Sequence, residues 1–430
     1  MDINIYSYYQ VFFVILYKIM IKTISLGCKV NAYESSALKE SLLSANITQD
    51  VVIVNTCSVT SVADQKSRQI IRRERKNQPN AILVVMGCYS QKNAEYVLNN
   101  CGADIIVGTA NRDKIQENLA TFLKNKKPII DINPDPRHFK YESFSSFAVP
   151  DSTRAYIKIE DGCNNFCSYC TIPYTRGVAR SRPKDEIIAE IKYLITKGYL
   201  EFVLTGIHTA HYGLDNHQCS FSDLVEEIVQ IPGLYRLRIS SIEESEIDEK
   251  LINLLKLYPN IANHLHMPLQ SGSREVLKRM KRKYNVDDFI NKVKMIREVR
   301  PDIAITTDVI VGFPGESEEE FNETFNFIQQ VKFAEIHVFP FSARPGTLAY
   351  EMKNQIDPRI KNERVQKLLD LSKKLQHDYQ EQFRGQELEV ILEERNKTNN
   401  MLSGFTSNYI KLEADLPDEK IGKVVKLKVR

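Results

Sequence analysis

Three cysteines within eight residues constrain this chain more than any other feature. Cys163, Cys167 and Cys170 follow an apolar run, residues 156–160, that predicts a strand. Soft thiolate ligands favour zinc or an iron–sulfur cluster. A closed zinc site needs four ligands, and the fourth would have to come from a distant part of the chain. Three thiolates on one loop instead fit a [4Fe-4S] cluster in which one iron has no protein ligand.

The length and composition are those of a multidomain globular protein. A chain of 430 residues exceeds what one hydrophobic core usually serves, so we expect two or three domains. The formal net charge is only +3, so any binding of nucleic acid must rely on local basic patches. Eight cysteines in a chain this long do not form a disulfide framework. They indicate a reducing, cytoplasmic compartment in which thiols bind metals.

The first 19 residues are interpreted as a dispensable extension or an over-long start. Their apolar run, residues 11–16, is too short to span a membrane. No small-residue cleavage site typical of a signal peptide follows it. Met20 stands immediately before a strand-like run, residues 21–26. We therefore expect no association with a membrane.

Residues 20–130 alternate between short apolar runs and helical patterns, which predicts a doubly wound parallel sheet. The predicted strands are 23–26, 50–55, 81–86 and 104–107, and the predicted helices are 35–44, 63–76 and 94–100. Cys28, Cys57 and Cys88 stand just past the first three strands. Since ligands bind at the carboxyl edge of such sheets, these thiols should converge on one crevice.

A second three-thiolate cluster is the favoured interpretation of these three cysteines, because they occupy equivalent positions after their strands. The alternative is that three thiols pack as small apolar residues at the strand ends. Cys101 and Cys219 share neither cysteine pattern and are interpreted as structural.

Residues 131–150 contain three prolines and several serines, and they predict a linker. Residues 151–380 predict a partial barrel of six βα repeats, a (βα)6 relative of the TIM barrel. After the strand at 156–160, the predicted strands are 201–204, 235–240, 264–268, 302–311 and 334–339. The predicted helices are 184–196, 221–230, 248–257, 273–279, 286–299 and 317–331.

Active sites of such barrels lie at the carboxyl ends of the strands, where the cysteine loop and several candidate residues fall. Gly206, Gly312 and Gly315 follow predicted strands there, although each could simply permit a turn. Four histidines are candidate imidazole ligands, with a structural role as the alternative. They are His208, His211, His264 and His266.

Residues 381–430 predict a small β-barrel that follows a long amphipathic helix, residues 359–384. Its predicted strands are 386–394, 402–406, 409–412 and 422–429. Such barrels often bind RNA through aromatic stacking and basic rims. The candidates for these contacts are Phe405, Tyr409, Lys411 and Lys423. The basic runs 72–76 and 278–283 also favour a polyanionic partner, although a charge run is often only a solvated surface.

Several of these segments resemble one enzyme family. The C-x3-C-x2-C spacing is the signature of radical S-adenosylmethionine (SAM) enzymes. Together with it, the segments 27–34 (GCKVNAYE), 55–57 (NTC), 86–88 (MGC) and 161–170 (DGCNNFCSYC) resemble the methylthiotransferases. The resemblance extends from about residue 20 to residue 430. It implies an N-terminal methylthiotransferase domain, a radical SAM core and a C-terminal TRAM domain.

The resemblance implies that the chain binds two [4Fe-4S] clusters and SAM. One cluster, which cleaves SAM, is held by Cys163, Cys167 and Cys170. The other, which handles sulfur, is held by Cys28, Cys57 and Cys88.

SAM itself is expected to contact residues on the same edge of the barrel. Tyr169 occupies the aromatic position of the cysteine loop and is expected to pack on the adenine of SAM. Gly312 and Gly315 match the later glycines of the family's Gly-x-Ile-x-Gly-x-x-Gly element, in which Asp308 replaces the first glycine. Gly206 remains from its Gly-Gly-Glu element.

Within the family, residues 28–31 (CKVN) resemble the branch that acts on threonylcarbamoyladenosine in tRNA. The branch acting on isopentenyladenosine typically has Cys-Gln-Met-Asn there, and the ribosomal-protein branch has a Cys-x-Lys-Asn pattern. Residues 204–207 (LTGI) also fit the first branch better than the Gly-Gln-Asn of the second.

The implied reaction is methylthiolation of carbon 2 of N6-threonylcarbamoyladenosine at position 37 of tRNA. It gives 2-methylthio-N6-threonylcarbamoyladenosine and needs an external one-electron reductant and a sulfur donor. Isopentenyladenosine in tRNA, or a ribosomal protein, is the alternative substrate. Two other classes remain: another radical SAM reaction on a protein or small molecule, and a non-enzymatic RNA-binding iron–sulfur module. The N-terminal cysteines disfavour the first, and the open iron disfavours the second.

A pocket for the threonylcarbamoyl group should contain a cation or several amide donors, because a buried carboxylate needs pairing. Arg176, Arg180 and Arg182 follow the cysteine loop and are candidates for this role. The alternative is that they form an exposed basic strip that contacts tRNA phosphate.

Overall fold

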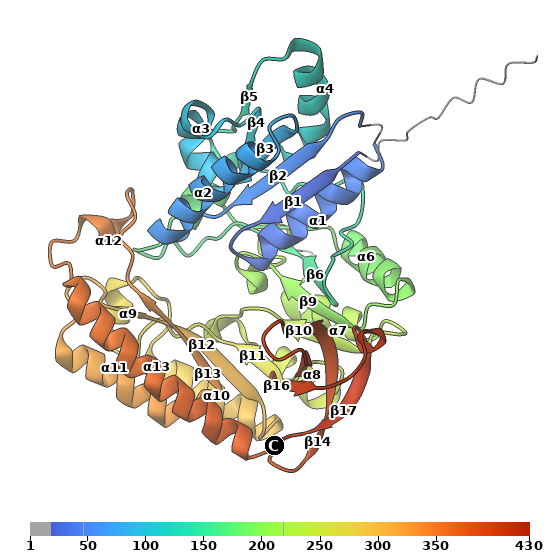
Figure 1. Ribbon diagram of the computed structural model, residues 1–430. Coiled ribbons are helices and arrows are strands. Elements are labelled where there is room, and N and C mark those ends of the chain that lie inside the picture. Colours follow the sequence, from blue (N-terminus) through green and yellow to red (C-terminus); the bar gives the residue numbers. More distant parts are fainter. Residues whose placement is uncertain (1–18, 46, 218) are drawn as a thin grey trace, which may run out of the picture.

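The computed structural model describes residues 19–45, 47–217 and 219–430. The predicted extension, residues 1–19, lies outside this part of the chain except for its last residue. Three regions follow one another: an N-terminal sheet, a barrel below it and a C-terminal sheet at the side of the barrel (Figure 1).

The N-terminal region is a five-stranded parallel sheet with helices on both faces. Its order is β1-β2-β3-β4-β5, with the bounds β1 (Ile21–Ser25), β2 (Val51–Thr56), β3 (Ile82–Gly87), β4 (Ile105–Val107) and β5 (Ile129–Asp131). One face packs on α1 (Lys29–Leu43) and α4 (Ile115–Asn125), and the other on α2 (Ser61–Asn77) and α3 (Cys88–Cys101). The predicted parallel sheet is confirmed, and its described strands follow the sequence without the reversal seen in nucleotide-binding doubly wound sheets.

The connection from this sheet to the barrel is packed rather than loose. The strand β5 ends at Asp131, the first residue of the predicted linker, residues 131–150. Beyond it, Phe139, Glu142 and Ala148 are buried against the neighbouring regions. The prolines and serines of this segment therefore shape a structured crossing between the two regions.

The barrel contains six parallel strands arranged as two three-stranded sheets. The sheet orders are β10-β9-β6 and β11-β12-β13. The strands are β6 (Arg154–Lys158), β9 (Glu201–Thr205), β10 (Arg236–Ile239), β11 (His264–His266), β12 (Ala304–Val311) and β13 (Glu335–Pro340). Single bridges from Leu237 to Ile261 and from Ser241 to His266 join the two sheets. Among the described residues β6 and β13 do not pair, so the barrel is partial, as the sequence predicts.

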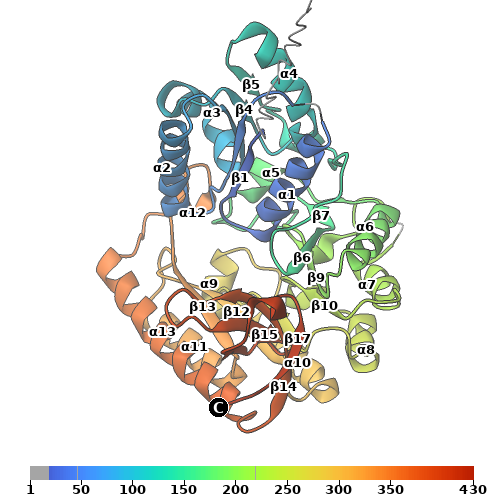
Figure 2. The ribbon, with the colours of Figure 1, turned by 45° about the vertical axis from the view of Figure 1, so that its right-hand side comes forward.

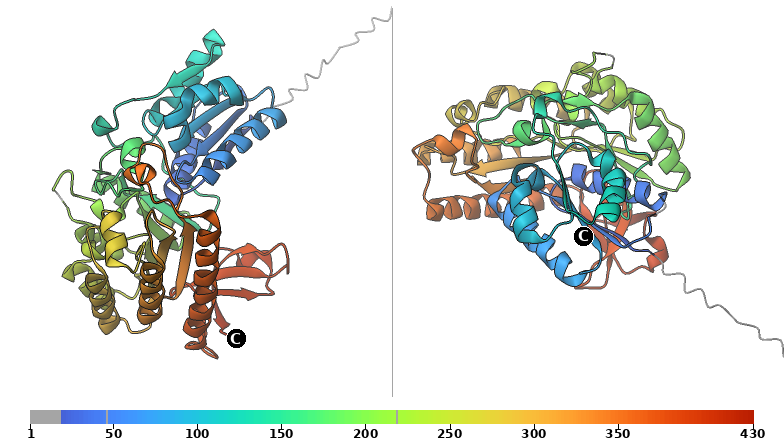
Figure 3. Two further views of the ribbon diagram at one scale, coloured as in Figure 1. Left: turned by 90° about the vertical axis from the view of Figure 1, so that its left-hand side faces the viewer. Right: turned by 90° about the horizontal axis from the view of Figure 1, so that it is seen from above.

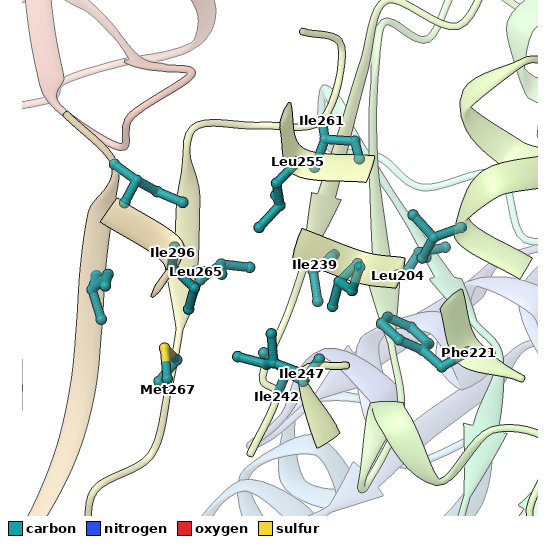
Figure 4. Packing of buried hydrophobic residues seen from close by; sticks show 14 of the residues in the cluster. Leu204, Phe221, Ile239, Ile242, Ile247, Leu255, Ile261, Leu265, Met267 and Ile296 are labelled. Atoms are coloured by element: carbon teal, nitrogen blue, oxygen red, sulfur yellow. The ribbon is translucent and has the colours of Figure 1, made fainter. Parts of the chain in front are cut away.

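Helices cover the outside of the barrel and bury their apolar faces against it. They are α6 (Lys184–Thr196), α7 (Phe221–Val229), α8 (Glu249–Leu257), α9 (Arg274–Arg279), α10 (Val286–Val299), α11 (Glu318–Val331) and α13 (Pro358–Glu381). Leu204, Ile239 and Leu265, on neighbouring strands, face the helices in this core (Figure 4). Capping boxes at the starts of α7, α10 and α11 fix where these helices begin.

Several short elements lie in the barrel, in the N-terminal region and in the connection between them. They are the antiparallel pair β7 (Glu160–Asp161) and β8 (Arg180–Ser181), the helices α5 (Ile172–Arg176) and α12 (Leu348–Glu351), and the 3-10 turns η1 (Arg112–Lys114), η2 (Pro136–His138), η3 (Thr209–His211) and η4 (Glu244–Glu246). The β7–β8 pair brackets the cysteine loop. Elements of two to five residues carry too little periodicity to be predicted from sequence.

The C-terminal region is an antiparallel sheet that lies beside α13 and the barrel strands (Figures 2 and 3). Its order is β16-β15-β14-β17, with the strands β14 (Glu387–Arg395), β15 (Leu402–Thr406), β16 (Lys411–Ala414) and β17 (Val424–Lys428) and the turn η5 (Asp418–Lys420). This half-barrel confirms the predicted C-terminal fold. Within the described part of the chain, no helix is long and apolar enough to cross a membrane.

Candidate active site

The cysteine loop of the barrel is closed by two glycines. Gly162 and Gly177 have φ angles of 88° and 81°, and the N–H of Cys163 donates to the carbonyl oxygen of Gly177 at 3.0 Å. A Cβ atom on Gly162 would lie 2.0 Å from the carbonyl oxygen of Val178. Only glycine fits this left-handed conformation and close approach. The two ends of the loop are thereby held together.

The three thiols of this loop lie close to one another. The N–H groups of Asn165 and Ile172 donate to the sulfur atoms of Cys163 and Cys170, both at 3.5 Å. Burial and the charges of neighbouring thiols raise the pKa of Cys163, and they raise the pKa of Cys170 to about 12. A metal cluster that binds these sulfurs as thiolates would offset this repulsion. The donor set therefore fits a [4Fe-4S] cluster with one open iron.

A basic side chain that sequence analysis assigned to an RNA-binding run instead contacts this loop. Arg282 donates from Nη1 to the Cys167 sulfur at 3.3 Å and pairs with Glu243 at 2.5 Å. Asn165 donates to the other oxygen of Glu243 at 3.1 Å. These three polar side chains hold one side of the loop. The sequence of residues 278–283 indicates positive charge, but it does not show whether each side chain points to solvent or into the protein.

The second set of cysteines converges as the sequence predicts. Cys28 caps α1, Cys57 follows β2, and Cys88 begins α3. Burial raises the pKa of Cys57 to about 11, and the charges of the Cys88 and Cys28 thiols contribute. A Cβ atom on Gly27 would lie 2.6 Å from the Cys57 sulfur, so this turn needs glycine. The binding of metal by these three thiols stays a prediction.

The two cysteine sets are neighbours across the contact between the N-terminal sheet and the barrel. Lys92 lies near a thiol of each set, because the charges of both Cys88 and Cys170 act on it. Burial, and then the charge of Arg344, lowers the pKa of Lys92. From the barrel side, Arg176 donates from Nε to the Cys88 sulfur at 3.4 Å. The six thiols therefore belong to one region of the molecule.

A buried network of charges joins the N-terminal sheet to the barrel behind the cysteines. Glu34 lies 2.5 Å from Arg112, 2.8 Å from Lys158 and 2.9 Å from Arg176. Asp161 pairs with Lys158 at 2.7 Å and with Arg176 at 3.0 Å. Although burial raises the pKa of Glu34, the charges of Arg112 and Arg176 hold it well below its usual range.

This network corrects the prediction for the three arginines after the cysteine loop. Arg176, Arg180 and Arg182 are buried, so they form neither an exposed strip for tRNA phosphate nor the cations of an open pocket. Arg176 and Arg180 pair with Asp161, and Arg182 pairs with Glu190. Sequence spacing placed them near the barrel mouth but could not show which acidic side chains they contact, among them the distant Glu34.

A cavity of about 530 Å³ lies where the three regions meet. The N-terminal sheet contributes residues 27–30, the barrel contributes strand-end residues, and the C-terminal sheet contributes Tyr409. The barrel residues include Thr205, Gly206, Arg238, Ser240, Ser241, His264, His266, Thr306, Asp308 and His337. Gly206 therefore lines the cavity, and a Cβ atom there would lie 2.7 Å from Oε2 of Glu160.

The other residues expected to bind SAM lie elsewhere on the same barrel edge. Tyr169 lines a second cavity of about 260 Å³ beside Phe341. Gly312 and Gly315 form the turn between β12 and α11, with φ angles of 70° and 76°. Their N–H groups donate to Glu316 and to the carbonyl oxygen of Asn354. Neither glycine lines the cavity of Gly206 or the cavity of Tyr169. The binding of SAM by these residues stays a prediction.

The candidate histidines occupy two polar clusters. His208 and His211 stack at 3.6 Å, and together with Cys163 their ligand atoms lie within 4.8 Å of one another. His208 also pairs with Glu246 at 2.7 Å. In the cavity, His266, Asp308 and His337 form a similar group. His264 is buried and stacks on Tyr409 at 4.4 Å.

The aromatic residues predicted to stack on RNA are engaged within the protein. Phe405 and Tyr409 stack on each other at 4.8 Å. The guanidinium of Arg154 lies over Phe405 at 4.7 Å, and that of Arg238 lies over Tyr409 at 4.9 Å. These rings therefore fasten the C-terminal sheet to the barrel. Of the predicted RNA contacts in this region, Lys411 and Lys423 are exposed.

Comparison with known proteins shows where the chain belongs. Residues 157–328 match the radical SAM superfamily, and residues 18–108 match the uncharacterized protein family UPF0004. A relative from Bacillus subtilis (strain 168), named threonylcarbamoyladenosine tRNA methylthiotransferase MtaB, is 44% identical over 94% of this chain and 92% of its own length. The chain belongs to the radical SAM methylthiotransferases. As a member of this family, the methylthiotransferase uses SAM and a [4Fe-4S] cluster.

A further relative of this methylthiotransferase has another name. The protein from Acetivibrio thermocellus, named tRNA-2-methylthio-N(6)-dimethylallyladenosine synthase, is 33% identical over 94% of this chain and 87% of its own. Among solved structures, the radical SAM methyltransferase TsrM from Kitasatospora setae, with cobalamin and a [4Fe-4S] cluster bound, is similar with a TM-score of 0.58. That likeness covers 77% of this chain and 73% of TsrM at 16% identity, and it shows the fold alone.

Proposed function

We propose that the methylthiotransferase acts on tRNA and adds a methylthio group to carbon 2 of N6-threonylcarbamoyladenosine at position 37. The observation that carries this proposal is the similarity to the Bacillus subtilis relative, at 44% identity, against 33–35% for relatives named for dimethylallyladenosine. Cys28, Lys29 and Val30, from the segment that resembles the threonylcarbamoyl branch, line the cavity where the three regions meet. A base splayed out of the tRNA would enter there.

The proposal includes two [4Fe-4S] clusters, one for each set of cysteines. Cys163, Cys167 and Cys170 would hold the cluster that binds SAM at its open iron. Cys28, Cys57 and Cys88 would hold the second cluster, which would carry the sulfur to be transferred. When bound, these cofactors supply the one-electron and sulfur chemistry that carbon 2 of adenine requires and that protein acids and bases cannot supply.

The residues of the chain position and shield this chemistry. Arg282 and Arg176 each donate to a cysteine sulfur, which stabilises the thiolate form of the ligand. The buried pairs of Glu34 and Asp161 keep the two cysteine sets at a fixed separation. Tyr409, which stacks on Phe405, lines the side of the cavity and would limit the entry of water.

Other participants follow from the same chemistry. The enzyme would need an external one-electron reductant and a sulfur donor, and it would work in the cytoplasm, where tRNA is modified. The exposed lysines of residues 278–283, together with Lys411 and Lys423, would contact tRNA phosphates.

A matched pair of cysteine variants tests the two-cluster proposal. The wild-type enzyme, reconstituted without oxygen, should contain about eight irons per chain. Cys167→Ala should retain about four irons and lose formation of 5′-deoxyadenosine from SAM, because thiolate ligation is local to each loop. Cys57→Ala should also retain about four irons, yet still form 5′-deoxyadenosine and yield no methylthiolated tRNA.

Undiminished 5′-deoxyadenosine formation by Cys167→Ala would contradict the assignment of the SAM-binding cluster. Methylthiolated product from Cys57→Ala, or about four irons in the wild-type enzyme, would contradict the second cluster. The two variants control for each other, since each removes one thiol from one of the two cysteine sets.

A further inference from the structure

In the part of the chain that the structure describes, a lysine that lines the cavity between the three regions forms no ion pair. Lys29 is the first residue of α1, directly after Cys28, and lines the cavity. Among the described residues, its side chain makes no hydrogen bond and no ion pair, and Asp308 is the carboxylate whose charge acts on it, from beyond ion-pair distance. The other charged side chains of the lining are engaged. Arg238 donates to Glu201 at 2.8 Å and to the carbonyl oxygen of Thr406 at 3.2 Å, and Asp308 lies 3.3 Å from His266.

The position of Lys29 is electrostatically unfavourable in the protein alone. The amino end of a helix carries partial positive charge, so a cation in its first turn is destabilising and an anion there is favoured. Lys29 is also only partly exposed, and a cation withdrawn from water is stabilised by an anionic partner. A free ammonium and a helix amino terminus therefore point into the same cavity, and both favour a bound anion.

The substrate of the proposed reaction carries a suitable anion in the correct place. On adenine, carbon 2 and carbon 6, which bears N6, flank N1 on the same edge of the ring. If carbon 2 faces the cluster held by Cys28, the group on N6 must lie beside that cluster, on the side of the cavity where Cys28 stands. Lys29 is its neighbour in the chain. The threonylcarbamoyl group ends in a carboxylate, whereas a dimethylallyl group is apolar.

We propose that Lys29 binds the carboxylate of the threonylcarbamoyl group and thereby selects this substrate over a base with an apolar N6 substituent. This inference rests on the proposed function and names the side chain that confers its specificity. Lys29 takes the carboxylate-binding role that the sequence suggested for the arginines after the cysteine loop, since those arginines are buried in ion pairs. The single ammonium donates to the carboxylate, and the N–H groups at the start of α1 contribute their partial positive charge.

The test compares two forms of the same tRNA. One carries threonylcarbamoyladenosine, and in the other its carboxylate has been converted to the methylamide. The wild-type enzyme should show a kcat/KM about tenfold to a hundredfold higher on the carboxylate form, as expected for a charge-assisted hydrogen bond. Lys29→Met should lose this preference through lower activity on the carboxylate form. Lys29→Arg, which keeps the charge, should retain most of it.

Two controls make the result specific to the carboxylate. Lys39→Met removes a lysine of the same helix that pairs with Asp151 at 3.0 Å, away from the cavity, and should keep the full preference. Formation of 5′-deoxyadenosine from SAM without tRNA, and the iron content, should be unchanged in Lys29→Met. If Lys29→Met does not load its clusters, Lys29→Gln takes its place in the same comparison.

The outcomes separate this inference from the function on which it rests. No methylthiolation of either tRNA by the wild-type enzyme would contradict the proposed function. An active wild-type enzyme whose preference survives in Lys29→Met would overturn only the role of Lys29. A raised KM for SAM in Lys29→Met would also overturn it, because the lysine would then bind the SAM carboxylate. Equal loss on both tRNAs would indicate a phosphate contact and would contradict the inference as well.

Discussion

Single buried charges hold the N-terminal sheet and the barrel of this enzyme together. Glu34, on α1, contacts cations from the barrel and from its own sheet, all of them buried. Because the folded-state pKa of Glu34 is lowered, its contribution to stability is present at neutral pH. That contribution is lost as the pH falls below the unfolded value of about 4.3.

Replacement of Glu34 by glutamine should destabilise the enzyme strongly. It keeps the shape of the side chain but leaves buried cations without their partner, which costs about 3–5 kcal/mol. We expect the thermal midpoint of the reconstituted enzyme at neutral pH to fall by several degrees. Glu40→Gln, on the more exposed part of the same helix, serves as the control. Equal midpoints for the two variants would contradict a structural role for this network.

At the scale of one element, the cysteine loop depends on backbone that only glycine adopts. Gly162→Ala would add a methyl group 2.0 Å from the carbonyl oxygen of Val178. The loop should then fail to close, and iron should fall towards about four per chain with the loss of the SAM-cleaving cluster. Gly198→Ala is a matched control, because its φ of 89° is similar but a Cβ there meets no atom within 4 Å. Full iron content in Gly162→Ala would contradict this account.

Elements were predictable where their pattern is local. The apolar β-branched runs of β2, β3 and β12 and the capping boxes of α7, α10 and α11 are readable in short windows of sequence. The convergence of Cys28, Cys57 and Cys88 was predictable because parallel strands end at one edge. The helix α4 was missed although Ile115, Leu119 and residues 122–123 recur at helical spacing.

Long-range pairing was not predictable in the same way. Arg176 pairs with Glu34, which is 142 residues away in the sequence. No local sequence pattern predicts that these two residues are partners. The same limit explains why Phe405 and Tyr409 were assigned to RNA rather than to the arginines of the barrel. Lys29 lies beside Cys28 in the segment that resembles the threonylcarbamoyl branch. That its side chain forms no ion pair with the described residues is visible only once the three regions are assembled.

At the scale of the whole molecule, the cavity belongs to no single region. The N-terminal sheet supplies Cys28 and Lys29, the barrel supplies the polar strand ends, and the C-terminal sheet supplies Tyr409. The substrate base must therefore be recognised by the assembled protein. The C-terminal sheet is fixed to the barrel by Arg154 and Arg238, so it forms part of the cavity wall as well as a candidate RNA-binding surface.

The central claim is that this assembled cavity accepts the threonylcarbamoyl base. The most direct measurement gives the reduced enzyme two purified tRNAs side by side, one bearing threonylcarbamoyladenosine and one bearing isopentenyladenosine, and analyses the nucleosides by mass spectrometry. We predict 2-methylthio-N6-threonylcarbamoyladenosine from the first tRNA and little product from the second. Preferred methylthiolation of the isopentenyl form would contradict the account.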